Sequence, residues 1–374
     1  MLILATTITK DRQNKERNLS VIICVSFLQL VWFHSSVDPN SVPDLPDYYD
    51  SFQMMPKYDW TQVSDVFRTN EYGYHYLNKI VSIFSQDFVF YQVIVSLIIL
   101  SCYYCTFIKY SPNVMLSVCL LVLSTYSQSL FVLRQHIAVG IVLFAYWAII
   151  ERKLTAYLLL CLLAYQFHHS TLLFIPIYFL CNINNKKMYF FALVATFFVL
   201  SYLSNNLSSF VSMFDVDYDL YMMDTSVNSL TYFFISLAYI ISFVIVMGKK
   251  VFDQGINKMI FTLMFISCLG TLFGSSITVM NRSLMYFQVI NTIAIPIIAS
   301  NIKQEFVRFL FVFAVIALNC YTHLKVIQTP SWLFMQMDYL LPISGVALII
   351  LSVIALNYFI KNTNNKKYEQ GFNF

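Results

Sequence analysis

The sequence has few charged residues. Asp, Glu, Lys and Arg make up 11% of its 374 residues, against about 25% in a typical soluble domain. This low charge content, with 59% hydrophobic residues, excludes an ordinary soluble domain. Alternation of apolar and polar residues is also lacking, which disfavours a membrane β-barrel. The apolar runs are continuous and of transmembrane length, and they predict an all-α polytopic membrane protein.

Three further motifs are missing. The short polar loops contain no nucleotide-binding motif, which excludes an ATP-driven pump. No small-residue cleavage site follows the first apolar run, 18–34, so we expect a retained helix rather than a signal peptide. Cys102 and Cys105 have CxxC spacing, but no second pair accompanies them. We interpret all eight cysteines as buried small hydrophobic residues that form no essential disulfide.

The apolar runs predict about twelve transmembrane helices in one membrane domain, residues 1–374. Their expected spans are 18–34, 88–108, 114–130, 134–150, 155–168, 171–182, 188–204, 231–247, 259–273, 282–300, 309–323 and 340–360. If the amino terminus is cytoplasmic, 17 of the 23 Lys and Arg residues lie inside and six outside. Because basic residues concentrate on the cytoplasmic side, both termini are predicted to be cytoplasmic.

Two extracytoplasmic loops are predicted, 35–87 and 205–230. The first is the longest loop and carries eight of the 19 acidic residues. Within it, residues 74–84 place apolar and aromatic side chains at roughly helical spacing, which predicts a short helix at the membrane interface. The second loop contains four aspartates but lacks the glycine and final glutamate of a calcium loop, so no metal site is predicted.

Isolated polar residues in apolar sequence mark a candidate site. A charge such as that of Arg134 costs at least a few kcal/mol in hydrocarbon, so it should face the bundle interior or a wet cavity and hold something anionic. Similar anomalies are Arg282 and the pair His168-His169. At ~1.5 Å per helical residue, Arg134 and His168 lie about 27 Å, and Arg282 about 32 Å, from the cytoplasmic boundary. All are therefore expected to converge on the external end of the membrane.

The residue types suggest the chemistry. Arg134 and Arg282 are each expected to open a helix, where guanidinium charge and free N–H groups suit phosphate or diphosphate. Imidazole titrates near neutral pH, so His168 and His169 suit the role of a general base or of a hydrogen-bond donor to a phosphate. Simpler interpretations stay open: Arg282 reaching lipid headgroups, Arg134 with Gln135 forming a structural ion pair with an external Asp, and the histidines as an interfacial cap.

At these residues the chain resembles EpsG-type membrane proteins, which belong with the Wzy-like O-antigen and exopolysaccharide polymerases. The resemblance spans roughly residues 18–300, and His169 departs from it as a second histidine. The stretches that carry it, in the family's order, are Pro46-Asp47-Tyr48-Tyr49-Asp50, Glu71-Tyr72-Gly73-Tyr74, Leu133-Arg134-Gln135-His136-Ile137-Ala138, Glu151-Arg152-Lys153, Ala164-Tyr165-Gln166-Phe167-His168-His169-Ser170 and Asn281-Arg282-Ser283-Leu284-Met285-Tyr286-Phe287.

The resemblance implies a GT-C-like helical fold and a polymerase acting outside the bacterial inner membrane. Such enzymes transfer a growing glycan from polyprenyl diphosphate to the acceptor sugar of a new lipid-linked repeat unit. By position, Arg134, Gln135 and Arg282 would bind the diphosphate. His168 occupies the family's histidine position, and Asp47 or Glu71 are candidates for the base.

The expected partners are a polyprenyl-diphosphate-linked oligosaccharide, membrane lipids and a chain-length regulator, with no cofactor and no nucleic acid. Other functions stay open. An O-antigen ligase usually has a larger late external loop, whereas the longest loop here comes first. A flippase or transporter should spread charge to both faces, whereas the anomalous charges here gather at one end. A membrane acyltransferase usually holds its histidine in a differently organised bundle.

Overall fold

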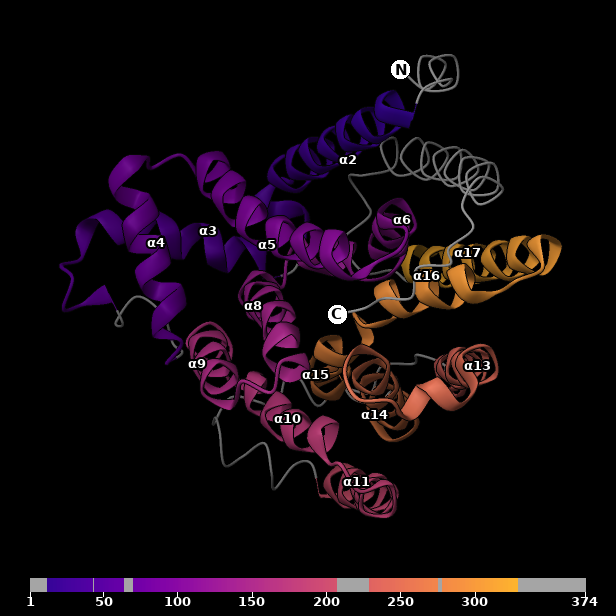
Figure 1. The fold of residues 1–374 in the computed structure, drawn as a ribbon. Helices are drawn as coiled ribbons and strands as arrows, with labels where there is room; N and C mark the ends of the chain where they lie inside the picture. Colours follow the sequence, from indigo (N-terminus) through magenta and orange to yellow (C-terminus); the bar gives the residue numbers. More distant parts are fainter. Residues whose placement is uncertain (1–11, 43, 64–69, 207–228, 275–277, 329–374) are drawn as a thin grey trace.

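The computed structural model describes residues 12–42, 44–63, 70–206, 229–274 and 278–328, and their regular structure is helical (Figure 1). Seven helical stretches are long and apolar enough to cross a membrane, and four shorter apolar ones accompany them. The predicted polytopic helical membrane protein is confirmed at this level. The twelfth predicted span, 340–360, and most of the loop 205–230 lie outside the described residues, so the count of twelve stays a prediction.

The helices follow the predicted spans closely in position. Those of the bundle are α2 (Arg12–Ser35), α5 (Phe88–Tyr110), α6 (Val114–Ser124), α7 (Tyr126–Ser129), α8 (Leu133–Ile150), α9 (Leu154–Tyr165), η4 (His169–Phe174), α10 (Ile175–Asn182), α11 (Lys186–Asn205), α13 (Ser229–Met247), η6 (Gly248–Phe252), α14 (Ile256–Gly274), α15 (Thr278–Gln288), α16 (Asn291–Asn301) and α17 (Glu305–Gln328). Those between α2 and α5 are η1 (Pro39–Ser41), α3 (Leu45–Met54), η2 (Met55–Lys57) and α4 (Tyr72–Phe84).

Three spans predicted as single helices are divided. The span 171–182 consists of the 3-10 helix η4 followed by α10. The span 114–130 breaks into α6 and α7. The span 282–300 breaks into α15 and α16, where the Ile290 N–H donates to the Phe287 carbonyl three residues back and tightens the turn. In α16, Pro296 has no N–H for the Thr292 carbonyl, and the buried Ser117 hydroxyl of α6 donates to that carbonyl at 2.7 Å. Packing against α6 thus stabilises the proline-containing helix.

The cysteine interpretation is partly wrong. All eight are free thiols, as predicted, but Cys24 and Cys105 are exposed and Cys320 is half-buried. Cys24 and Cys105 lie on outward faces of α2 and α5, where a small apolar side chain suits contact with lipid as well as with protein.

Polar contacts tie loops together at both ends of the bundle. At one end, Arg152 after α8 donates to the Asn184 amide oxygen at 2.8 Å, and the Lys258 ammonium of α14 donates to the Ile183 carbonyl. We call this the Arg152 end. At the opposite end, the Gly73 N–H donates to the Gln166 carbonyl at 2.9 Å. We call this the Glu71 end, after the residue that precedes α4.

The segment 35–87 packs onto the Glu71 end, where α3 and α4 lie beside α5 (Figure 1). The helix predicted at 74–84 is present as α4. The Lys79 ammonium anchors it by donating to the carbonyls of Met55 and Tyr58, at 2.9 and 2.6 Å. Four of the exposed large side chains of α4 follow one another at intervals of three or four residues, which places them along one face; they are Tyr72, Tyr76, Ile80 and Ile83.

The bundle core centres on α8, which packs closely against α5. A Cβ on Gly140 would lie 3.0 Å from the Cys102 Cβ and 3.1 Å from its Sγ, so a larger residue here would require Cys102 to move by a few tenths of an ångström. Small residues at such crossings let helices in a membrane meet along their backbones.

We expect Gly140→Ala to destabilise the protein by about 1–3 kcal/mol, because the added methyl group overpacks the α5–α8 contact. The measurement is the unfolding temperature in detergent. Cys102→Ala in the same background should recover part of the loss. Phe144→Ala, on the same helix at a side chain 43% exposed, is the matched control and should change little. An unchanged unfolding temperature for Gly140→Ala would contradict the close packing.

Candidate functional site

The Glu71 carboxylate joins three segments that are far apart in the sequence. Its Oε2 accepts from Arg134 Nη1 at 2.5 Å, and its Oε1 accepts from His168 Nδ1 at 2.6 Å. The three side chains, called the Glu71 cluster below, come from the start of α4, the first turn of α8 and the turn after α9. Two residues expected at the external end from helical rise, Arg134 and His168, are thus brought together by a third.

The cluster is recessed but accessible. The Glu71 side chain is 5% exposed, whereas those of Arg134 and His168 are 24% and 23% exposed. The carboxylate therefore lies behind the two basic side chains. A ligand that enters from the surface would meet guanidinium and imidazole before carboxylate, which favours an anionic group.

Backbone contact fixes Glu71 in this place. α9 has 12 residues, about 18 Å, and so is shorter than the ~30 Å hydrocarbon core of a bilayer. The start of α4 packs against the end of α9, where a Cβ on Gly73 would lie 2.8 Å from the Gln166 Cβ. Glycine at position 73 thus allows the contact that holds Glu71 beside His168.

The electrostatics favour an ionised Glu71. Burial by itself would raise the pKa of the carboxyl, but the charge and hydrogen bond of His168 and the charge of Arg134 outweigh it and lower the pKa to about 2. Glu71 is a carboxylate at neutral pH, held by two basic partners. As a proton acceptor at that pH it is weak.

Tyr48 of α3 completes the surroundings of Arg134. Its hydroxyl accepts from Arg134 Nε at 3.3 Å, and its ring centroid lies 5.6 Å from the guanidinium carbon. Burial raises the pKa of the Tyr48 phenol, which keeps it neutral and able to donate a hydrogen bond.

The two adjacent histidines have different environments. His168 binds Glu71 through Nδ1, so its Nε2 is the nitrogen that the ion pair does not use. His169 stacks on Tyr165, with ring centroids 4.6 Å apart, and its Nε2 donates to the Asn70 carbonyl at 3.4 Å. Only His168 belongs to the ion-paired cluster.

A buried tyrosine attaches α15 to the histidine turn. The Tyr286 hydroxyl accepts from the Ser170 and Thr171 hydroxyls at 3.3 and 3.1 Å. Arg282 precedes Tyr286 by four residues on α15. The expectation that Arg282 opens its helix is wrong, because α15 begins four residues earlier, at Thr278. The Arg282 side chain lies outside the described part of the structure.

The remaining candidates lie apart from the cluster. Asp47 is exposed on α3, and it has no hydrogen bond or ion pair within the described residues. Gln135 is fully buried in α8, so its predicted contact with a diphosphate requires substrate to reach into the bundle. Both assignments stay predictions. Within the described ranges, no three His, Cys, Asp or Glu side chains gather as metal ligands.

Sequence reasoning did not single out Tyr48, Gly73 or Tyr286. Each lies inside a stretch that carries the family resemblance, and that was the only signal available. Their roles depend on contacts across 86, 93 and 115 positions of sequence, to Arg134, Gln166 and Thr171.

The fold and site define a class: a polytopic helical membrane protein with an ion-paired arginine, glutamate and histidine recessed at one end of its bundle. The sequence matches the EpsG family over residues 20–342, most of the chain, and the protein belongs to that family. Membership supports, in general terms, a polysaccharide polymerase-type role. No curated protein matches the chain. No solved structure matches it either.

We expect Glu71→Gln to lower the unfolding temperature at pH 7. The pKa of Glu71 in the folded protein, about 2, lies below its ordinary value of 4.5. The carboxylate therefore contributes stability above pH 4.5, about 3 kcal/mol, and this is lost as the pH falls from 4.5 toward 2. The difference from wild type should shrink over that window, measured by thermal unfolding in detergent between pH 7 and 3.

Asp47→Asn is the matched control, since this carboxyl is exposed and lies in the same loop. It should leave the pH profile of stability unchanged. Equal stability of Glu71→Gln and wild type at pH 7 would refute a stabilising role for the ion pair.

Proposed function

We propose that the protein polymerises lipid-linked oligosaccharide repeat units on the extracytoplasmic face of a bacterial inner membrane. It transfers the growing glycan from polyprenyl diphosphate to the acceptor sugar of a new repeat unit. The observation that carries the proposal is the Glu71 cluster, which combines a recessed arginine for phosphate with an oriented histidine. Family membership supports the substrate class.

In this proposal the Glu71 end faces outward. The support is that basic loops around Arg152 and Lys258 meet at the opposite end, which the positive-inside rule assigns to the cytoplasm. Twelve spans, cytoplasmic termini, a GT-C-like arrangement and extracytoplasmic loops at 35–87 and 205–230 belong to the same proposal. The exposed apolar face of α4 then lies at the extracytoplasmic interface of the inner membrane.

Arg134 and Arg282 neutralise the leaving diphosphate. Arg134 is the accessible guanidinium of the Glu71 cluster. Arg282 is one helical turn before Tyr286, which binds the residues directly after His169. That position on α15 brings its backbone toward the same turn. Two guanidinium groups stabilise charge that develops on the diphosphate as the sugar departs.

His168 acts as the general base, and Glu71 orients it. The acceptor hydroxyl oxygen attacks the anomeric carbon of the growing glycan, and the bond from that carbon to the diphosphate oxygen breaks. The hydroxyl proton passes to His168 Nε2, while Nδ1–H stays hydrogen-bonded to Glu71. A carboxylate that fixes the tautomer and stabilises the imidazolium is a recurring arrangement in enzymes. Asp47 is the alternative base.

We expect Arg134→Ala and Arg282→Ala each to reduce long-chain polysaccharide at least about 10²-fold, because charge stabilisation at the leaving group is lost. The measurement is complementation of a polysaccharide-deficient host, with glycan size read on a gel. Protein level and single repeat units should stay intact. Arg152→Ala, just beyond the other end of α8, is the control and should support normal chains.

Normal chain-length ladders from both arginine variants would refute the polymerase assignment. Failure of the wild-type chain to restore long chains, with attachment of single units intact, would favour a ligase. Loss of extracytoplasmic repeat units in the variants would instead point to a flippase.

Separate substitutions distinguish the two histidines. We expect His168→Ala to lower the polymerisation rate by about 10²–10⁴-fold, the usual contribution of a general base, and His169→Ala to lower it by less than about tenfold. The assay is incorporation of purified lipid-linked repeat units in proteoliposomes, followed against pH. The reverse ranking would assign the base to His169.

A further inference from the structure

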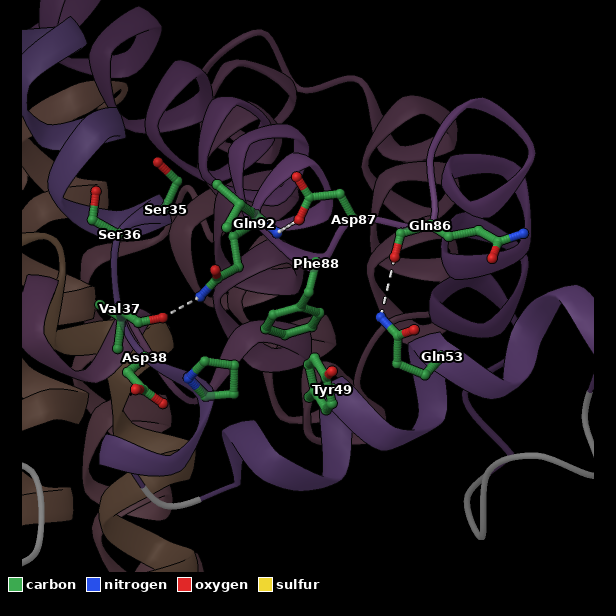
Figure 2. Close-up of a pocket in the computed structure, with 12 residues that line it drawn as sticks. Ser35, Ser36, Val37, Asp38, Tyr49, Gln53, Gln86, Asp87, Phe88 and Gln92 are labelled. Atoms are coloured by element: carbon green, nitrogen blue, oxygen red, sulfur yellow. Dashed lines mark hydrogen bonds between the residues drawn. The ribbon is translucent and has the colours of Figure 1, made fainter.

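A cavity of about 630 Å³ has a lining that includes no member of the Glu71 cluster (Figure 2). It opens between the end of α2 with η1, the helix α3, and the start of α5. Its size falls within the usual range of small-molecule sites. Figure 2 shows side chains from all three segments around it, among them Asp38, Tyr49 and Gln92.

A buried amide lies at the inner side of this cavity. Gln92 is 2% exposed, and its Nε2 donates to the Val37 carbonyl at 3.0 Å. Within the described part of the chain, its carbonyl oxygen accepts no hydrogen bond. This oxygen is not one of the buried side-chain atoms that lack a partner; it faces the cavity, where a ligand hydroxyl can donate to it.

Two carboxylates add further acceptors. Asp38 Oδ1 accepts from the Asn40 N–H at 2.8 Å, and Asp87 Oδ1 accepts from the Val89 N–H at 2.9 Å. One oxygen of each carboxylate caps its own helix, which leaves Oδ2 for a ligand. None of the twelve described lining residues is Lys, Arg or His. The cavity therefore repels phosphate and diphosphate, in contrast to the Glu71 cluster.

An aromatic surface completes the lining. Tyr49 is 38% exposed, and its ring packs edge-on against Phe88 with centroids 5.1 Å apart. Its ring offers an apolar face and its hydroxyl a polar tip. Acceptor oxygens beside an exposed aromatic ring match a sugar, which presents hydroxyl donors at its edge and C–H groups on its faces.

We propose that this cavity binds a neutral sugar of the lipid-linked glycan, separately from the diphosphate. The inference rests on the proposed function and names a second subsite for its substrate. Helix α3 links the two sites, because Tyr48 contacts Arg134 and the next residue, Tyr49, lines the cavity. Helix α5 makes a less direct link: Gln92 lines the cavity, and Tyr91 hydrogen-bonds Tyr74 of α4, whose ring packs against Tyr48. A glycan held in the cavity thus lies next to the reacting end.

The test uses full-length protein in nanodiscs and two probes. The first is the phosphate-free oligosaccharide released by mild acid from the host's own lipid-linked repeat unit, and the second is inorganic diphosphate. Binding is measured by NMR titration. Asp87→Asn keeps the helix cap but removes the charge. Tyr49→Ala removes the aromatic surface, and Asp50→Asn, an exposed carboxyl on α3 outside the cavity, is the matched control.

We expect Asp87→Asn and Tyr49→Ala each to weaken oligosaccharide binding at least about tenfold and to leave diphosphate binding unchanged. Arg134→Ala should weaken diphosphate binding and leave oligosaccharide binding unchanged, and Asp50→Asn should change neither. In polymerisation assays, the cavity variants should raise KM for the repeat unit more than they lower kcat.

Oligosaccharide binding that is unchanged in both cavity variants, or absent in wild type, would overturn the inference. If a lipid chain occupies the cavity, the wild-type protein will show no oligosaccharide binding. The proposed function fails separately, if the wild-type chain makes no long polysaccharide in the complementation assay.

Discussion

The double contact of the Glu71 carboxylate is the interaction on which the site depends. One side chain from the loop 35–87 pairs with Arg134 at the start of α8 and with His168 after α9. The buried carboxylate strongly resists separation from the guanidinium and the imidazole, because without these partners it would be an uncompensated buried charge. The pair of contacts therefore fixes the loop, the guanidinium and the imidazole relative to one another in a bundle whose other contacts are mostly apolar.

The two contacts of Glu71 determine which role each neighbouring group can take in the proposed mechanism. Because Glu71 is committed as an ion-pair partner with a pKa near 2, the proton transfer of the proposed mechanism falls to His168 rather than to the carboxylate. In the proposed mechanism the basic groups bind phosphate, while the cavity around Gln92, which is lined by two carboxylates, binds uncharged sugar. Opposite electrostatics in two adjacent sites would orient a lipid-linked glycan with its diphosphate toward Arg134 and its sugars toward α2 and α5.

Much of the fold was predictable because the signal is local. Long apolar runs fix where helices form, and eleven of the expected spans correspond to apolar helical segments. The breaks were not predictable. The division of 282–300 depends on the turn at Ile290, and α16 depends on the Ser117 hydroxyl that satisfies the carbonyl opposite Pro296. Within the site, Arg134 and His168 stood out as polar residues in apolar sequence, whereas Tyr48 and Tyr286 are common residue types whose roles arise from distant contacts.

The sequence by itself determined that this chain is a polytopic helical membrane protein and that Arg134 and His168 should lie near one end of it, because hydrophobicity and helical rise act along the chain. Only the tertiary structure decided which carboxylate joins them. Asp47 and Glu71 are both acidic residues of the segment 35–87. Asp47 is exposed on α3, whereas the Gly73–Gln166 contact holds Glu71 in a buried position. Burial and ion pairing depend on how the helices pack, so Asp47 and Glu71 differ in the folded protein although the sequence alone does not distinguish them.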